Sequence, residues 1–106
     1  MNLEIAALNG QLDEGFRQYV EQRLRAGLLR FEPRIVRATV SFLDLSGPYG
    51  AEQQCCLALN LVPSGEVSIE RRGASVRLAL GRAVETATRE LRRRFEAMEN
   101  PLERAA

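Results

Sequence analysis

The sequence predicts an α+β fold with the element order β-α-β-β-β-α, a two-layer sandwich with two helices packed on one face of a four-stranded sheet. Two segments, residues 13–29 and 75–98, repeat apolar side chains every three or four positions, which is typical of amphipathic helices. The stretch between them alternates apolar and polar residues with a period of two, as half-buried strands do. A chain of 106 residues suffices for one domain, which we expect over residues 1–98, followed by a short tail at 99–106.

The first strand and the first helix follow from local signals near the N-terminus. Residues 2–8 alternate apolar and polar side chains and are expected to form a strand, and Asn9-Gly10 is typical of a turn. Asp13 is expected to cap a helix that ends near Leu28 or Leu29, and Gly27 to loosen its last turn. The apolar face of this helix recurs every four residues at Phe16, Val20, Leu24 and Leu28.

Three further strands are expected in the middle of the chain. The first begins near Arg34, and its inward side chains are expected to be Val36, Ala38, Val40 and Phe42. Residues 46–50 form a loop to a strand over 52–62, whose inward side chains are expected to be Cys55, Leu57, Leu59 and Leu61. A tight turn at 63–65 leads to a short strand over 66–70. Such short connections indicate an antiparallel meander.

The second helix is the longest periodic segment of the chain. Ser75 is a suitable N-cap, and Asn100-Pro101 is expected to end the run. The apolar stripe consists of Val76, Leu80, Val84, Ala87, Leu91, Phe95 and Met98. Both helices therefore carry one apolar face, which the sheet can cover.

The composition excludes several classes of function. His is absent, so the chain has no Ser-His-Asp or Cys-His apparatus and no imidazole metal ligand. We therefore expect no enzyme, no cofactor, no metal site and no small-molecule substrate. The sequence shows no secretory signal and no apolar run long enough to span a bilayer, which favours a cytoplasmic protein without a membrane partner.

The only two cysteines, Cys55 and Cys56, are adjacent within a predicted strand, so their side chains are expected on opposite faces. One interpretation is a redox sensor or a thiol ligand. The other is one buried apolar side chain and one surface thiol. We favour the second interpretation, because free cysteine usually behaves as a small hydrophobic residue.

A net charge of +1 conceals a segregation of charge, because all 15 basic residues are Arg and most lie in or beside the predicted helices. Residues 16–37 hold six Arg against two Glu, and residues 75–98 hold six Arg against three Glu. On an ideal helix Arg82, Arg89 and Arg93 project within about 40° of one another, opposite the apolar stripe. Such a ridge suits phosphate, since guanidinium groups bind two oxygens at once. A solvated face with Glu85–Arg89 and Arg92–Glu96 pairs accounts for the same pattern.

The element order and several segments resemble the ribosome hibernation-promoting factors, a family that includes the ribosome-associated inhibitor called protein Y. The resemblance rests on Met1-Asn2-Leu3-Glu4-Ile5, the first-helix segment 16–24, Arg30-Phe31 and the second-helix segments 79–85 and 89–93. It covers residues 1 to about 96. The chain departs from the family pattern at Thr86, at Gly81 and at the start of the second helix, Ser75 to Arg77.

The resemblance implies a non-enzymatic factor that binds ribosomal RNA of the small subunit in the channel for messenger and transfer RNA. Such a factor keeps the ribosome idle in stationary phase or under stress and inhibits translation. Carried over by position, the RNA-binding candidates are Arg17, Arg23, Arg30, Arg82, Arg89, Arg92 and Arg93. The alternative is a diverged paralogue that acts as a protein-interaction module or as a homodimeric regulator, and a weak homodimer remains open in either case.

Overall fold

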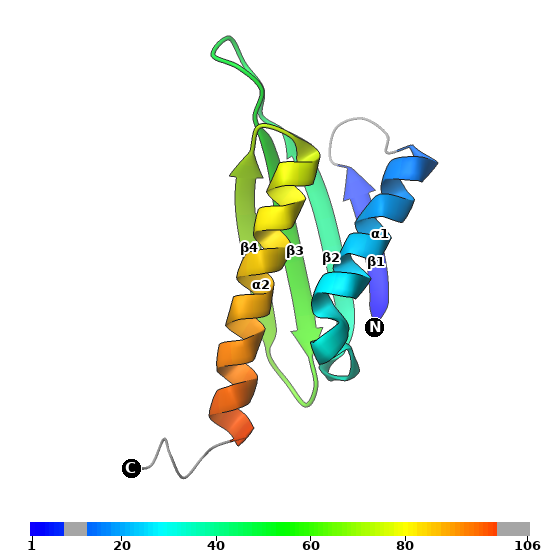
Figure 1. The fold of residues 1–106 in the computed structure, drawn as a ribbon, viewed down its shortest axis with the longest axis vertical. Coiled ribbons are helices and arrows are strands. Elements are labelled where there is room, and N and C mark those ends of the chain that lie inside the picture. Colours follow the sequence, from blue (N-terminus) through cyan, green and yellow to red (C-terminus); the bar gives the residue numbers. More distant parts are fainter. Residues whose placement is uncertain (8–12, 100–106) are drawn as a thin grey trace.

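The structure, a computed structural model, describes residues 1–7 and 13–99 and has the predicted order of helices and strands (Figure 1). Its elements are β1 (Asn2–Ala7), α1 (Glu14–Leu28), the 3-10 helix η1 (Leu29–Arg34), β2 (Ile35–Asp44), β3 (Gln53–Leu61), β4 (Glu66–Gly73) and α2 (Val76–Glu99). The turn expected at Asn9-Gly10 and the helix end expected at Asn100-Pro101 lie outside the described residues. The α+β fold class is confirmed.

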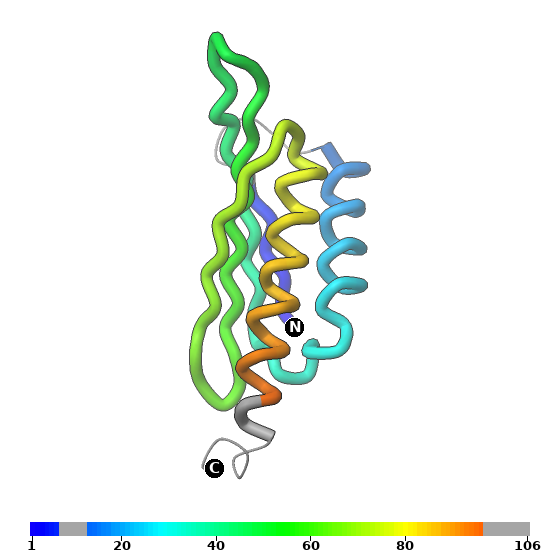
Figure 2. Tube along the Cα trace, turned by 60° about the vertical axis from the view of Figure 1, so that its left-hand side comes forward, coloured from blue at the N-terminus to red at the C-terminus, as the bar shows by residue number. Residues whose placement is uncertain are grey.

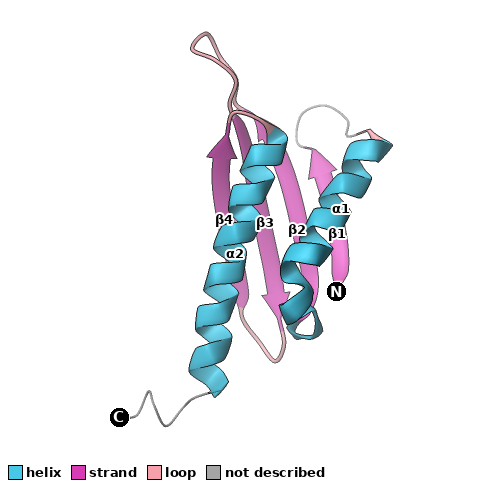
Figure 3. Ribbon diagram, in the orientation of Figure 1, coloured by secondary structure: helices cyan, strands magenta, loops and turns pink. Residues whose placement is uncertain are grey.

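The four strands form one mixed sheet in the order β1-β2-β3-β4. Strands β2, β3 and β4 pair antiparallel, which confirms the predicted meander, and β1 pairs parallel with β2. Figure 2 shows both helices on the same side of the sheet, and Figure 3 separates the helical layer from the strands by colour. The helix α2 packs on β3 and β4, whereas α1 packs on β1 and against α2.

Both helices begin at the side-chain caps that the sequence predicts. The Asp13 carboxylate accepts a hydrogen bond from the Phe16 N–H at 2.7 Å, and the Ser75 hydroxyl accepts one from the Leu78 N–H at 3.1 Å. These bonds satisfy backbone donors that the first helical turn leaves without a partner. The buried core contains most of the predicted inward residues, including Val20, Leu24, Leu28, Ala38, Val40, Phe42, Cys55, Leu57, Leu59, Leu61, Leu80, Val84, Ala87, Leu91 and Phe95.

The inward position expected for Val36 is wrong. The pairing of β2 with β3 shifts between Ile35 and Arg37, so β2 carries one extra residue at its start. This irregularity turns Ile35 into the core and leaves Val36 exposed. From Ala38 onward the predicted alternation holds.

The two helices approach each other closely at Gly27. A Cβ atom built on Gly27 would overlap Cγ1 of Val84 on α2. The Thr88 hydroxyl can donate a hydrogen bond to the Val84 carbonyl of its own helix, at 2.8 Å, or to the Gly27 carbonyl of α1, at 3.3 Å. It therefore links the two helices at the same point. Gly27 therefore sets the spacing between the helices, a role different from the loose last turn expected from the sequence.

The two cysteines differ in burial, as the favoured interpretation predicts, so we expect a maleimide to label only Cys56 in the folded protein at neutral pH. Cys55 is fully buried, and burial, reinforced by the nearby Cys56, raises the pKa of its thiol to about 12. Cys56 is half-buried on the opposite face of the sheet. Mass spectrometry should find one label in the native chain, none in Cys56→Ser, and two labels in the unfolded wild-type chain.

The pKa of the Cys55 thiol is higher in the folded chain than in the unfolded chain. The buried neutral thiol therefore makes its full contribution to the free energy of unfolding at any pH below the pKa that Cys55 has in the unfolded chain. That contribution is lost as the pH rises towards 12. Rapid labelling of Cys55 in the native chain at neutral pH would contradict this account of the buried thiol.

Candidate nucleic-acid interface

A groove of about 510 Å³ lies between α1 and α2 at the Gly27–Val84 contact. Its lining residues are Arg23, Gly27, Val84, Glu85, Thr88, Arg89 and Arg92. Residues four positions apart share a helix face, which explains why Arg23 and Gly27 reach the groove together from α1. The same spacing brings Thr88 and Arg92 to it from α2.

A second, smaller hollow of about 70 Å³ continues the groove towards η1, and Arg92 lines both. The guanidinium of Arg30 lies 5.5 Å from the centre of the Phe31 ring, and that of Arg34 lies 4.9 Å from the centre of the Phe95 ring. Both distances lie within the range of a cation–π attraction, which restricts the two guanidinium groups. We call the row formed by both hollows the arginine groove, and its basic residues are Arg23, Arg30, Arg34, Arg89 and Arg92.

The charges of the arginine groove are little compensated within the protein. Among the side chains that the structure describes, those of residues 1–6 and 13–96, no ion pair joins a carboxylate to Arg23, Arg89 or Arg92. The pairs Glu85–Arg89 and Arg92–Glu96 expected for a solvated face are therefore not formed. The carboxylates of Glu85 and Glu96 also line the two hollows, but the five arginines outnumber them and leave the surface positive, which suits a chain of phosphates.

The carboxylate that does form pairs on α2 is Glu90, which binds Arg93 and Arg94. Desolvation raises the pKa of Glu90, but the hydrogen bond from Arg94 and the charge and hydrogen bond of Arg93 outweigh it and hold that pKa below its ordinary value. Arg93 thus belongs to a surface pair beside the groove.

The structure brings four of the seven candidate residues to the arginine groove, namely Arg23, Arg30, Arg89 and Arg92. Arg82 lies nearer the start of α2, where it donates to the Arg72 carbonyl at 2.7 Å. Arg17 is exposed on α1, about 120° around the helix from Arg23, and so faces away from the groove.

Sequence reasoning missed two arginines that take part in the same surface. The guanidinium of Arg34 contacts the Phe95 ring because the 3-10 helix η1 turns Arg34 towards α2. The apolar pattern of the sequence does not predict this short helix. Arg77 stacks on the Tyr19 ring at 4.2 Å and extends the basic edge between the helices. The seven-residue spacing of Arg77 and Val84 places both on one face of α2, and this signal was available in the sequence.

Within the described part of the chain, no three Cys, Asp or Glu side chains gather where they could hold a metal ion. No described helix is long and apolar enough to cross a membrane. The chemistry that this surface offers is the positive charge and the hydrogen-bond donors of its guanidinium groups.

No protein-family model and no curated protein matches the sequence. Solved structures do match. The N-terminal domain of protein Y from Thermus thermophilus has a TM-score of 0.73 and 26% sequence identity, covering 88% of this chain and 98% of that one. A ribosomal subunit interface protein from Coxiella burnetii has a TM-score of 0.75 and 10% identity, covering 91% and 99%, and shows the fold alone. The chain shares its fold with both proteins over most of its length, and it is also similar in sequence to the Thermus protein. It is thus similar to the protein Y and hibernation-promoting factor family, as its sequence predicts.

Proposed function

We propose that this protein is a non-enzymatic ribosome-associated factor that binds ribosomal RNA of the small subunit in the channel for messenger and transfer RNA. It keeps ribosomes idle in stationary phase or under stress. The names of the two structural neighbours, protein Y and a ribosomal subunit interface protein, support the ribosome as the partner. The single observation that carries the proposal is the arginine groove, whose lining brings Arg23, Arg30, Arg89 and Arg92 together from α1, η1 and α2.

The groove supports RNA binding through backbone contacts. Helical RNA is recognised mainly by its shape, its phosphates and its 2′-hydroxyl groups, because its deep major groove excludes side chains. Arg23 on α1 and Arg89 and Arg92 on α2 can each donate two hydrogen bonds to phosphate oxygens. No bond is made or broken in this process. The protein acts by occupying the channel that translation requires.

Co-sedimentation with purified small and large ribosomal subunits across a salt series tests the proposal. Each neutralised phosphate contributes about −0.7 to −0.9 to the slope of log affinity against log salt, so the four candidate arginines of the groove predict a slope of about −3. Binding should prefer the small subunit and should compete with messenger RNA. Absence of binding to either subunit at low salt, or binding to the large subunit alone, would refute it.

The open face of the sheet favours a second candidate function, a protein-interaction module or a homodimer. This face lies opposite both helices (Figure 2) and holds a hollow of about 330 Å³ whose lining includes Cys56 and Ala58. Charge reversal at Arg89 and Arg92, which both line the arginine groove, separates the two candidates. Ribosome binding should then be lost, whereas a contact through the open face should remain. Sedimentation velocity of the free protein measures self-association directly.

A further inference from the structure

The connection between β2 and β3 is an arm that projects beyond the sheet, at the end where α2 begins (Figure 1). Gly47 and Gly50 exchange two backbone hydrogen bonds of 3.1 Å across its tip. Lower down, the Leu45 N–H donates to the Glu52 carbonyl at 2.8 Å, and the Ser46 hydroxyl accepts from the Glu52 N–H at 3.0 Å. We call residues 44–52 the arm. These bonds give it a defined shape without support from the core.

The base of the arm is held by one carboxylate. Asp44 accepts hydrogen bonds from the Ser46 N–H at 2.8 Å and from the Gln53 side-chain amide at 2.9 Å. Hydrogen bonds from the Ser46 side chain and backbone, with a smaller one from Gln53, keep the pKa of Asp44 below its ordinary value. The carboxylate is therefore charged near neutral pH and holds both partners.

Tyr49 lies at the tip of this arm and is as exposed as in an isolated peptide, at 102%. The ordered backbone on either side presents the ring at little further cost in conformational entropy, since a tyrosine side chain has only two rotatable angles. Gly47 and Gly50 flank it, and at both positions the space that a Cβ would fill is empty. The ring is consequently accessible to a flat ligand.

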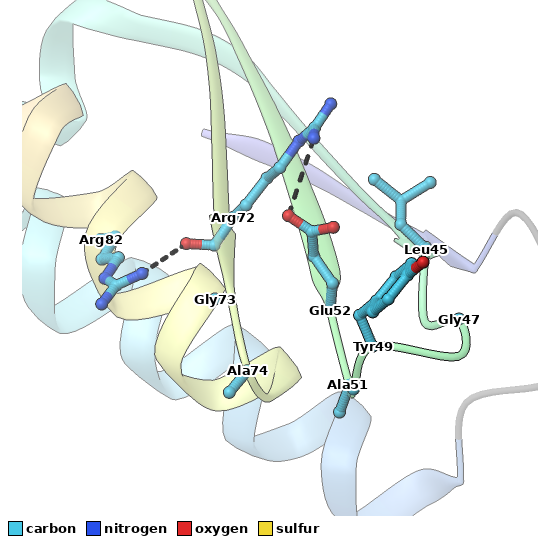
Figure 4. A pocket seen from close by; sticks show the side chains of 10 residues that line it. Leu45, Gly47, Tyr49, Ala51, Glu52, Arg72, Gly73, Ala74 and Arg82 are labelled. Atoms are coloured by element: carbon cyan, nitrogen blue, oxygen red, sulfur yellow. Dashed lines mark hydrogen bonds and ion pairs between the residues drawn. The ribbon is translucent and has the colours of Figure 1, made fainter.

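A hollow of about 460 Å³ separates the arm from the start of α2 (Figure 4). Tyr49 and Glu52 line it from the arm, Arg72 from β4 and Arg82 from α2. Arg82 uses one N–H on the Arg72 carbonyl, at 2.7 Å, and has further donors on the same guanidinium. Arg72 lies 3.6 Å from the Glu52 carboxylate in a surface pair with both side chains about half exposed. Two cations against one anion leave the hollow positive.

We propose that this hollow binds an unpaired nucleotide of RNA, with its base stacked on Tyr49 and its two flanking phosphates held one by Arg72, on the open face of the sheet, and the other by Arg82, on the side of α2. An exposed aromatic ring beside guanidinium groups is the combination by which proteins hold single-stranded RNA. The charge of the hollow disfavours a cationic or purely apolar peptide. The proposal rests on the ribosome-binding function for the source of the RNA. The nucleotide site would add a position for an unstacked base at the N-terminal ends of the two helices, opposite the end where η1 lies.

Tyrosine fluorescence provides a direct test, because the chain has two tyrosines and no tryptophan. Tyr19→Phe keeps the ring beneath Arg77 and leaves Tyr49 as the only tyrosine. The probes are an adenosine hexanucleotide and a chain of the same length whose residues lack bases. The hexanucleotide should quench Tyr49 and bind about 10- to 100-fold more tightly than the abasic chain, the range expected for one stacked base.

Three variants in the Tyr19→Phe background define the roles of the side chains. Tyr49→Ala should bind the hexanucleotide about 10- to 100-fold more weakly, while Tyr49→Phe should bind like the parent, since stacking needs only the ring. Arg82→Gln should weaken both probes alike, because a phosphate contact does not depend on the base. Tyr49 makes no core contact, so circular dichroism should show that its variants fold normally.

Equal affinity for the two probes, or an unchanged affinity of Tyr49→Ala, overturns the proposal. So does a loss of ribosome binding in Tyr49→Ala without any quenching by RNA, since the arm would then contact a ribosomal protein. Quenching by the hexanucleotide in a protein that does not sediment with ribosomes supports the nucleotide site and refutes the ribosome-binding function. Sedimentation that survives Tyr49→Ala unchanged, without quenching, refutes only the nucleotide site.

Discussion

Replacing Arg23, Arg89 and Arg92 together by glutamine should weaken binding to small ribosomal subunits by about 1000-fold or more. The three guanidinium groups line one groove, and no carboxylate of the described residues pairs with them. Each guanidinium group is therefore available to a phosphate, and a hydrogen bond to a charged group contributes about 1.5–3 kcal/mol. Losing three phosphate contacts should also make the slope of log affinity against log salt shallower by about 2 to 3.

A matched control separates the groove from the net charge of the protein. The control triple variant replaces Arg25, Arg37 and Arg94 by glutamine, which removes the same three charges from outside the groove. In the structure these residues pair with Glu21 and Glu32, with Glu4 and with Glu90, respectively. Its affinity should stay within about threefold of wild type, because exposed paired charges contribute little. Equal losses in both triple variants would show that only overall charge matters.

The fold was predictable because its local and long-range requirements agree. The apolar periods of both helices, the caps at Asp13 and Ser75 and the alternation in β3 indicate the same sandwich that the structure shows. The position of Val36 was not predictable in this way. The register shift at the start of β2 belongs to its pairing with β3, and a single strand's alternation carries no information on its partner.

The candidate site was predictable only in part, because the periodicity of one helix carries no information on how that helix meets its neighbours. Helical geometry correctly places Arg82, Arg89 and Arg93 on one ridge, but neighbouring elements then divide them. Glu90 binds Arg93, the carbonyl of Arg72 binds Arg82, and Arg89 lies in the groove. The juxtaposition of Arg89 with Arg23 depends on how closely α1 approaches α2. In the sequence, the only sign of this close approach is Gly27. Its role can be recognised only when the position of Val84 on α2 is known.

Gly27→Ala should lower the free energy of unfolding by about 1–2 kcal/mol, although alanine is the better helix former by about 1 kcal/mol. The new methyl group would overlap Cγ1 of Val84, a β-branched side chain with one strongly preferred rotamer in a helix. Gly81 provides the matched control, since nothing lies within 4 Å of the position of its Cβ. Gly81→Ala should therefore raise the free energy of unfolding by about 0.8–1 kcal/mol. Urea denaturation of the two variants measures these opposite changes.

The double variant Gly27→Ala/Val84→Ala identifies the cause of the loss. Val84→Ala alone costs stability through lost burial, but it also removes the methyl group that the new Cβ would meet. The two substitutions should therefore cost less together than the sum of their separate effects, by about 1 kcal/mol or more. Because the Gly27–Val84 contact also sets the width of the arginine groove, Gly27→Ala should weaken ribosome binding while Gly81→Ala leaves it unchanged. Additive costs in the double variant, or a stabilised Gly27→Ala, would show that the helices have room to separate and that glycine does not set their spacing.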